Sequence, residues 1–195
     1  STEVGQHQMW TAEFYNFRNP RSFASSGGLG TMGYGFPGAI GAQIGNPDTP
    51  VIMISGDGGM QMNIQEFATA VLQELPVILC VFNNTYLGMV RQWQKLFYGK
   101  RYAMTCLRSG KACEGKCGVE GCECPPYTPD FVKLAESYGA KGLRVFNTEE
   151  VAAAFETARQ NKKGPTLIEF IIDPEDLVYP MVKPGGALEE LIMDC

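Results

Sequence analysis

Residues 51–84 read VIMISGDGGMQMNIQEFATAVLQELPVILCVFNN and carry the clearest structural signal in the chain. Two short apolar runs, 51–55 and 77–82, have the length and composition of buried β-strands. Residues 63–74 lie between them and have the pattern of a helix. A strand, a tight GDGG loop, a helix and a second strand form a βαβ unit, so we expect the two strands to be parallel neighbours.

The helix expected at 63–74 carries signals at its start and along one face. Asn63 and Glu66 are spaced as an N-cap residue and its capping-box partner. Phe67 and Val71 then repeat at helical spacing. The sequence therefore predicts a helix that begins at Asn63 and packs an apolar face on the sheet.

The second half of the chain repeats the alternation of helices and strands. Thr128, Pro129 and Asp130 predict a helix start, with Thr128 as N-cap and Pro129 at the first helical position. The segments expected after it are a strand at 142–145, a helix at 149–162 and a strand at 166–172. We expect residues 1–195 to form a single α/β domain, with a mostly parallel sheet flanked by helices and a cysteine-bearing excursion at 106–126.

Composition excludes several classes of protein. The chain has 195 residues, with 45% hydrophobic and 19% charged residues, which excludes disorder as a description of the whole chain. A net charge of −5 argues against binding nucleic acid or an anionic membrane surface, and no apolar run is long enough to span a bilayer. The opening STEVGQHQMW contains no secretory leader, so we expect a cytoplasmic protein. The chain does not begin with Met, which is compatible with a segment of a longer protein.

Polar side chains follow both strands of the βαβ unit. Asp57 comes directly after the first strand, and Asn83 and Asn84 end the second. Because the carboxyl ends of parallel strands meet at one edge of a sheet, the Asp57 carboxylate and an amide oxygen are expected to converge there. Such oxygens suit Mg²⁺, and the glycines beside Asp57 suit a diphosphate. Either motif alone could be a plain turn, but the pair at this spacing favours a ligand site.

The GDG motif followed by NN resembles the thiamine diphosphate binding motif of thiamine-dependent enzymes. The flanking segments extend the resemblance to the large catalytic subunit of the acetolactate synthase family: VGQHQMW at 4–10, SSGGLGTMGYGFPGAIGA at 25–42, NNTYLGMVRQWQ at 83–94 and YPMVKPGG at 179–186. The resemblance covers nearly the whole chain except about 106–126. It corresponds to the C-terminal third of that subunit, the domain that holds the diphosphate end of the cofactor.

The resemblance implies a role for each matching position. Asp57 and Asn84 would give side-chain oxygens to Mg²⁺, Tyr86 would give its backbone carbonyl, and Gly58 and Gly59 would contact the diphosphate. The other cofactor-binding positions that it implies are Gln6, His7, Gly30, Thr31, Met32, Leu87, Gly88 and Met89.

Three apolar side chains would shape the reacting end of the cofactor site. By resemblance, Met32 would be the wedge that holds the cofactor bent, while Met89 and Trp93 would line the substrate pocket. Packing in an ordinary core remains the alternative for all three residues. The basic residues Arg91, Lys95, Lys100 and Arg101 form a patch that is more typical of solvated surface than of a ligand site.

The resemblance also implies an activity and its partners. The implied activity is a step of branched-chain amino-acid biosynthesis that depends on thiamine diphosphate. Pyruvate is decarboxylated and then condensed with a second 2-keto acid, which is pyruvate or 2-ketobutyrate. The family's N-terminal pyrimidine-binding domain, with its relay glutamate, and its central FAD domain are absent from this sequence. A homo-oligomer with a small regulatory subunit would be expected of the full subunit. Two alternatives stay open: another thiamine-dependent carboligase or oxidase, and a non-catalytic binding module.

The resemblance assigns no role to the cysteines of the excursion at 106–126. Their spacing matches no standard zinc or iron–sulfur pattern, although four thiolates could gather around one Zn²⁺. A metal or disulfide clip and a set of thiols without a ligand are equally compatible with the sequence. The residues concerned are Cys106, Cys113, Cys117, Cys122 and Cys124.

Overall fold

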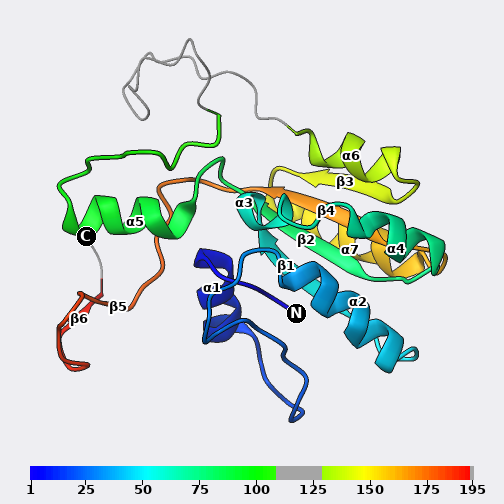
Figure 1. The fold of residues 1–195 in the computed structure, drawn as a ribbon, viewed down its shortest axis with the longest axis horizontal. Coiled ribbons are helices and arrows are strands. Elements are labelled where there is room, and N and C mark those ends of the chain that lie inside the picture. Colours follow the sequence, from blue (N-terminus) through cyan, green and yellow to red (C-terminus); the bar gives the residue numbers. More distant parts are fainter. Residues whose placement is uncertain (109–128, 194–195) are drawn as a thin grey trace.

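A computed structural model describes residues 1–108 and 129–193 of the chain, which fold around a parallel β-sheet (Figure 1). The sheet has four strands in the order β1-β2-β4-β3, all parallel. The last of them in the sequence, β4, lies between β2 and β3. The strands are β1 (Ile52–Gly56), β2 (Ile78–Asn83), β3 (Lys141–Val145) and β4 (Thr166–Ile171). The predicted α/β fold with a mostly parallel sheet is confirmed.

The strands form because their apolar runs can be buried on both faces of the sheet. Side chains alternate between the faces, so Leu79 and Val81 enter one apolar cluster while Ile78 and Cys80 enter the other. All four of these strand residues are at most 4% exposed. A continuous apolar strand of this kind is stable only where helices cover both sides.

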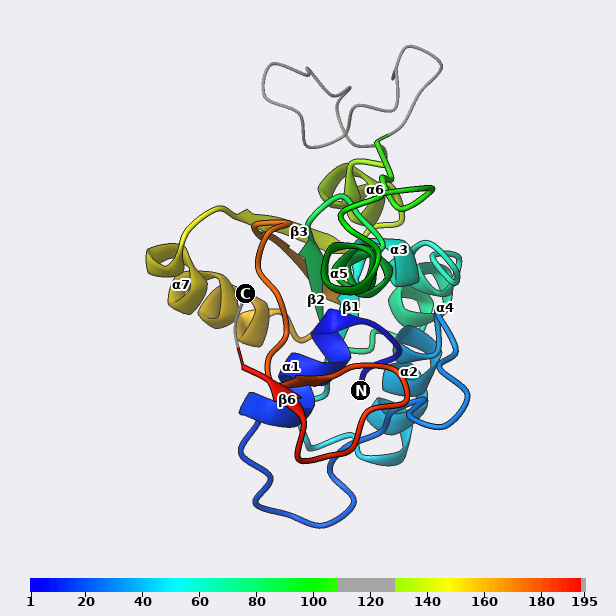
Figure 2. The ribbon, with the colours of Figure 1, turned by 90° about the vertical axis from the view of Figure 1, so that its left-hand side faces the viewer.

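Helices do cover both faces (Figure 2). The first cluster unites the sheet with residues of α2 (Gly35–Gly45), α4 (Glu66–Leu72) and α6 (Phe131–Ser137). The second cluster contains Ala154 and Ala158 of α7 (Thr148–Gln160). On the same side, α1 (Gln6–Phe14) sets Trp10 against Phe82 of β2, with ring centroids 6.5 Å apart. The sheet is therefore the middle of three layers.

Several elements gather beyond the carboxyl ends of the strands (Figure 1). The short α3 (Asp57–Met60) follows β1 at once, and α5 (Gly88–Phe97) follows β2 after a short loop. The C-terminal part adds a small antiparallel pair, β5 (Met181–Val182) and β6 (Leu191–Ile192). No helix within the described ranges has the length and apolar character needed to cross a membrane.

Two expected helix starts differ from the structure. No side chain in the described part of the chain caps α4, which begins at Glu66 rather than Asn63, so the predicted capping box is wrong. Asn63 instead donates its Nδ2 hydrogen bond to the carbonyl of Gly33 at 2.8 Å. Tertiary contact with Gly33, in the glycine-rich loop at 26–34, thus competes with local capping.

The other helix start lies later than the sequence pattern predicts. Asp130 is the N-cap of α6, accepting from the backbone N–H of Lys133 at 3.3 Å, whereas it was expected within the first turn. Thr128 lies outside the described residues. So do Cys113, Cys117, Cys122 and Cys124, and a metal or disulfide clip in the excursion stays a prediction.

Candidate functional site

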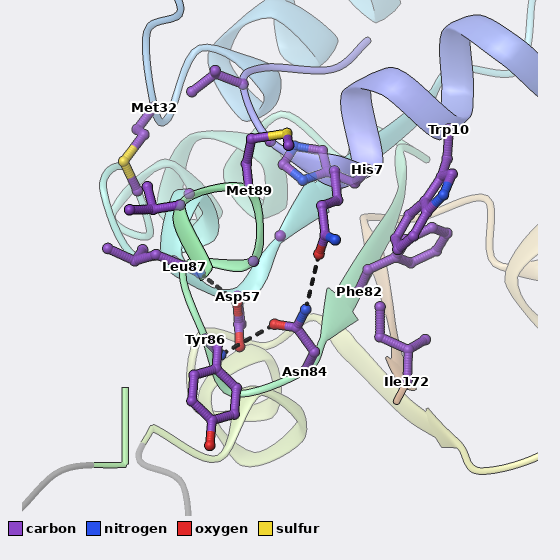
Figure 3. Close-up of a pocket in the computed structure, with 18 of the residues that line it drawn as sticks. His7, Trp10, Met32, Asp57, Phe82, Asn84, Tyr86, Leu87, Met89 and Ile172 are labelled. Atoms are coloured by element: carbon purple, nitrogen blue, oxygen red, sulfur yellow. Dashed lines mark hydrogen bonds between the residues drawn. The ribbon is translucent and has the colours of Figure 1, made fainter. Parts of the chain in front are cut away.

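A cavity of about 170 Å³ opens at the carboxyl edge of the sheet (Figure 3). It lies between α1, the loop that carries Met32, α3 and the start of α5. The residues that line it are Val4, Gly5, Gln6, His7, Trp10, Met32, Gly56, Asp57, Gly58, Gly59, Phe82, Asn84, Tyr86, Leu87, Gly88, Met89, Val90, Trp93 and Ile172. Most of these residues are glycine or apolar, so only a few polar side chains could bind a ligand there.

Asp57 supplies the carboxylate of the cavity. It is only 2% exposed, and its two oxygens accept backbone hydrogen bonds from Gly58 (2.9 Å) and Thr85 (2.7 Å). Burial raises the pKa of Asp57 to about 7, although both hydrogen bonds favour the charged form. A carboxylate this poorly solvated gains strongly from a nearby cation.

The loop after β2 brings Asn84 beside Asp57. Thr85 has a φ of 66°, a left-handed conformation that is rare for a β-branched residue. This bend turns the Thr85 N–H to Asp57 and lets Asn84 Oδ1 accept from the backbone N–H of Tyr86 at 3.1 Å. Figure 3 shows the carboxylate of Asp57 and the carboxamide of Asn84 next to each other. The two predicted oxygen donors therefore meet at one edge of the sheet.

The backbone of Tyr86 faces the same place. Thr85 and Leu87, on either side of it, bond to the segment 105–107: Leu107 N–H donates to Thr85 O, and Leu87 N–H donates to Thr105 O, both at 2.8 Å. Tyr86 lies between these two residues, opposite Cys106 in an antiparallel bridge. In this arrangement, the N–H and C=O of the central residue face away from the paired segment. The Tyr86 carbonyl therefore points away from 105–107, on the side where its N–H meets Asn84.

His7 is a second titratable side chain of the cavity wall. Burial lowers its pKa to about 3, so the imidazole is neutral at pH 7. Within residues 1–108 and 129–193, its buried Nε2 has no hydrogen-bond partner. An unpaired buried nitrogen beside the cavity is compatible with a polar ligand that supplies the missing partner.

Glycines allow close approach around Asp57. A Cβ on Gly58 would lie 2.7 Å from a methyl group of Leu87, and one on Gly56 would lie 3.1 Å from His7 Nδ1. At Gly56 and Gly58, the turn from β1 into α3 therefore lies tightly against neighbouring side chains. Hard oxygen donors, bare backbone and an unpaired imidazole together fit a divalent cation and an anionic group such as a diphosphate.

The structure brings most of the predicted site residues to this cavity. The exceptions are Gly30 and Thr31, which do not line it; Thr31 is exposed and donates its N–H to Ser26 Oγ at 2.9 Å. Trp93 lines the rim and is 46% exposed. Other lining residues were not predicted, among them Trp10, Phe82 and Ile172, because an apolar side chain at a binding site has the same sequence signal as one in the core.

Within the predicted basic patch, Lys100 and Arg101 are exposed as expected, whereas Arg91 and Lys95 of α5 are not solvated surface. The side chain of Arg91 is 4% exposed, donates to the Pro174 carbonyl at 2.7 Å and forms an ion pair with Glu175. Its guanidinium also lies over the ring of Tyr86, 4.8 Å from the centroid. Lys95 pairs with the same Glu175 at 2.9 Å. The expectation of solvated surface was wrong for Arg91 and Lys95, because their shared partner Glu175 lies about 80 residues away in the sequence.

Comparison with protein families gives an independent assignment. Residues 3–170 match the model of the thiamine pyrophosphate enzyme C-terminal TPP binding domain, where TPP is thiamine pyrophosphate, or thiamine diphosphate. The chain belongs to this family. The match includes every element of the parallel sheet up to β4 and nearly all of the cavity lining. Thiamine diphosphate is therefore the ligand class that this kind of domain binds.

Curated relatives narrow the comparison. The chain is 47% identical, over 98% of its length, to a probable acetolactate synthase large subunit of Methanococcus aeolicus. It is 45% identical over 96% of its length to the acetolactate synthase large subunit of Corynebacterium glutamicum, and 44% identical over 98% to the mitochondrial acetolactate synthase catalytic subunit of Saccharomyces cerevisiae. The chain spans 25–29% of the length of these relatives.

Proposed function

We propose that this chain is the domain of an acetolactate synthase that anchors Mg²⁺ and the diphosphate end of thiamine diphosphate. The full protein would decarboxylate pyruvate and condense it with pyruvate or 2-ketobutyrate. The observation that carries the proposal is the convergence of Asp57, Asn84 and the Tyr86 backbone on one cavity edge. The domain family and the names of the relatives support it.

The chain's own groups would divide the binding work. Asp57, Asn84 Oδ1 and the Tyr86 carbonyl would hold Mg²⁺, while the backbone at Gly58 and Gly59 would lie against the diphosphate. Buried Asp57 would pass from an unfavourable desolvated charge to a paired one when the cation binds. The same cation would attract the anionic diphosphate, so each ligand would favour binding of the other. His7, neutral and lacking a partner for Nε2, would contact the diphosphate end without adding charge.

The apolar part of the cavity would serve the reacting end. Bound thiamine diphosphate supplies an electron sink for the carbanion that loss of CO₂ produces. Met32 would support the bent cofactor, and Met89 and Trp93 would form an apolar wall that excludes water. FAD, a homo-oligomer and a regulatory small subunit would belong to the full protein, in the cytoplasm. Neither alternative from the sequence has an observation in its favour.

Binding of the cofactor tests the proposal directly. We expect titration calorimetry to detect thiamine diphosphate binding that requires Mg²⁺. Asn84→Ala removes one oxygen donor and should weaken this binding at least about tenfold, which corresponds to about 1.4 kcal/mol. Asn46→Ala is the matched control, because its amide bonds Ala42 O at the far end of α2. Equal binding with and without Mg²⁺ would refute the proposed role of the edge.

Turnover gives a second prediction. The chain of residues 1–195 alone should form no acetolactate from pyruvate, because Asp57 is the only acidic residue among the described lining residues and the cation would occupy it. His7 cannot relay protons near pH 7 with a pKa of about 3. A colorimetric acetolactate assay at saturating cofactor measures this, with the whole acetolactate synthase of a relative as the positive control. Product above the buffer blank would contradict the prediction.

A further inference from the structure

Three buried side-chain amides connect the cavity edge to the C-terminal segment. Asn84 Nδ2 donates to Gln6 Oε1 at 3.2 Å, and Gln6 Nε2 donates to Gln92 Oε1 at 2.8 Å (the first link is drawn in Figure 3). Gln92 is 0% exposed, and the other two residues are buried as well. We call Asn84, Gln6 and Gln92 the amide chain.

Backbone groups fix the orientation of the amide chain at its far end. Gln92 bonds both polar backbone groups of Val178: the Val178 N–H donates to Gln92 Oε1 at 2.9 Å, and Gln92 Nε2 donates to the Val178 carbonyl at 2.8 Å. A backbone N–H can only donate and a carbonyl can only accept. Only one of the two flipped orientations of the Gln92 amide therefore satisfies both bonds.

This orientation is passed along the amide chain. Because Gln92 presents its oxygen, Gln6 must present Nε2, which also donates to the carbonyl of Asp176 at 3.1 Å. Gln6 then has only Oε1 left for Asn84, so Asn84 must present Nδ2. The Asn84 oxygen then lies on the side of Asp57, where a cation would need it, and the Tyr86 N–H, which can only donate, holds it there from the other end.

The space around the amide chain is shaped for this contact. Gly88 begins α5 beside it, and a Cβ there would lie 2.8 Å from Asn84 Nδ2 and would overlap Gln6 Oε1. A side chain at position 88 would therefore separate Asn84 from Gln6. Gln92 itself does not line the cavity, so it can act on a ligand only through the other two amides.

We propose that Gln92 is a positioning residue that, together with the Tyr86 N–H and the Asp176 carbonyl, fixes the direction of the Asn84 carboxamide and so presents its oxygen to the divalent cation. The inference rests on the proposed function, because it presumes that a cation binds at Asn84. Partners behind a metal ligand typically change metal affinity about 10–100-fold when they are removed. We expect a change of this size from the loss of the Gln92 amide.

The test compares two substitutions of a buried glutamine by methionine in the full-length protein. Gln92→Met removes the anchor of the amide chain. Gln43→Met is the matched control, since Gln43 lies in α2 away from the cavity and is 2% exposed. Its side chain donates to the carbonyls of Asn46 (3.0 Å) and Thr49 (3.1 Å), which follow the helix. With thiamine diphosphate held constant, Mg²⁺ is titrated and binding is followed by tryptophan fluorescence. The apparent Kd for Mg²⁺ should rise about 10–100-fold in Gln92→Met and stay within about twofold in Gln43→Met.

A second background separates positioning from general loss of structure. In Asn84→Asp both side-chain oxygens can face the cation, so the direction of the group no longer matters. Gln92→Met should then raise the Kd for Mg²⁺ by less than about threefold, whereas purely structural damage would act equally in both backgrounds. Equal fold-changes in the two backgrounds would overturn the proposal, as would parental Mg²⁺ affinity in Gln92→Met.

Folding and the proposed function are controlled separately. Thermal melting without Mg²⁺ shows whether Gln92→Met is folded; if it is not, Gln92→Asn replaces it, because the shorter amide cannot reach both Gln6 and Val178. The same outcomes decide the proposal with that variant. If the parent protein shows no Mg²⁺-dependent binding of thiamine diphosphate, the proposed function fails before the amide chain is tested.

Discussion

Replacing Asp57 by asparagine is expected to make the protein more stable without its ligands and unable to gain stability from them. The pKa of this carboxyl is raised by burial from its ordinary value of 3.8 to about 7. A raised acid pKa means that the proton is bound more tightly in the folded protein than in the unfolded chain. The protonated carboxyl therefore stabilises the folded state below about pH 4, and this contribution is lost as pH rises to about 7. At pH 8 the charged Asp57 then costs about 4 kcal/mol, at about 1.4 kcal/mol per pKa unit.

The uncharged amide of the Asp57→Asn variant would avoid this cost but would lose one of the two hydrogen bonds that the carboxylate accepts, at about 1 kcal/mol. The net gain of about 3 kcal/mol should raise the melting temperature at pH 8 by roughly 6–12 °C for a chain of this size. At pH 4 the two proteins should melt within a few degrees of each other. The parent should regain stability on addition of Mg²⁺ and thiamine diphosphate, and Asp57→Asn should not.

Differential scanning calorimetry from pH 4 to pH 8, with and without both ligands, measures all of these effects. Asp48→Asn is the control for a change of charge alone, since Asp48 is exposed in the turn after α2. A melting temperature of Asp57→Asn that is lower than the parent's at pH 8 would contradict the burial argument. A ligand-induced shift of parental size in this variant would contradict the role of Asp57 as an anchor.

The apolar pattern of the sequence was enough to predict the sheet and the edge where the site lies. Continuous apolar runs around 51–55 and 77–82 can be buried only in a sheet covered on both faces, and the helix between them makes the strands parallel. Parallel neighbours end at the same edge, so Asp57 and Asn84 had to approach each other. These predictions depend on periodicity and topology, which a single sequence contains.

Contacts between distant segments could not be predicted in this way. Asn63 has the sequence pattern of a cap, yet it bonds Gly33, because only the folded chain brings the glycine-rich loop near it. Arg91 is buried because Glu175 lies opposite it. The left-handed φ of Thr85 has no sequence signal, since a β-branched residue rarely adopts it. Such a conformation costs about 1–3 kcal/mol and is maintained by the surrounding structure.

Glu3 is a further residue whose importance only the structure reveals. It is 1% exposed, and its carboxylate accepts hydrogen bonds from Ser55 Oγ and from the backbone N–H groups of Gly33 and Gly35. It thus ties the loop that carries Met32 to the end of β1. Burial raises the pKa of Glu3, while these three hydrogen bonds favour its charged form.

Gly59→Ala is expected to disrupt this contact. A Cβ at Gly59 would overlap Glu3 Oε1 and lie 3.2 Å from Ser55 Oγ, so the carboxylate would have to leave its donors. Overpacking and buried donors without partners each cost about 1–3 kcal/mol, and we expect a loss of about 3 kcal/mol in the free energy of unfolding. Gly41→Ala is the matched control: a Cβ there meets nothing within 4 Å and lies in α2, so it should be neutral or slightly stabilising.

A double-mutant cycle shows whether the clash with Glu3 is the cause. Glu3→Asp shortens the side chain by one methylene and withdraws the carboxylate from position 59, at a cost of its own because the backbone donors of Gly33 and Gly35 are less well reached. In that background Gly59→Ala meets less obstruction, so the combined loss measured by urea denaturation should be smaller than the sum of the single losses by about 1–2 kcal/mol. Strictly additive losses would show that the methyl group at position 59 acts on α3 alone. The cycle therefore tests whether the loop that carries Met32 and the turn at Asp57 are held together through one buried carboxylate.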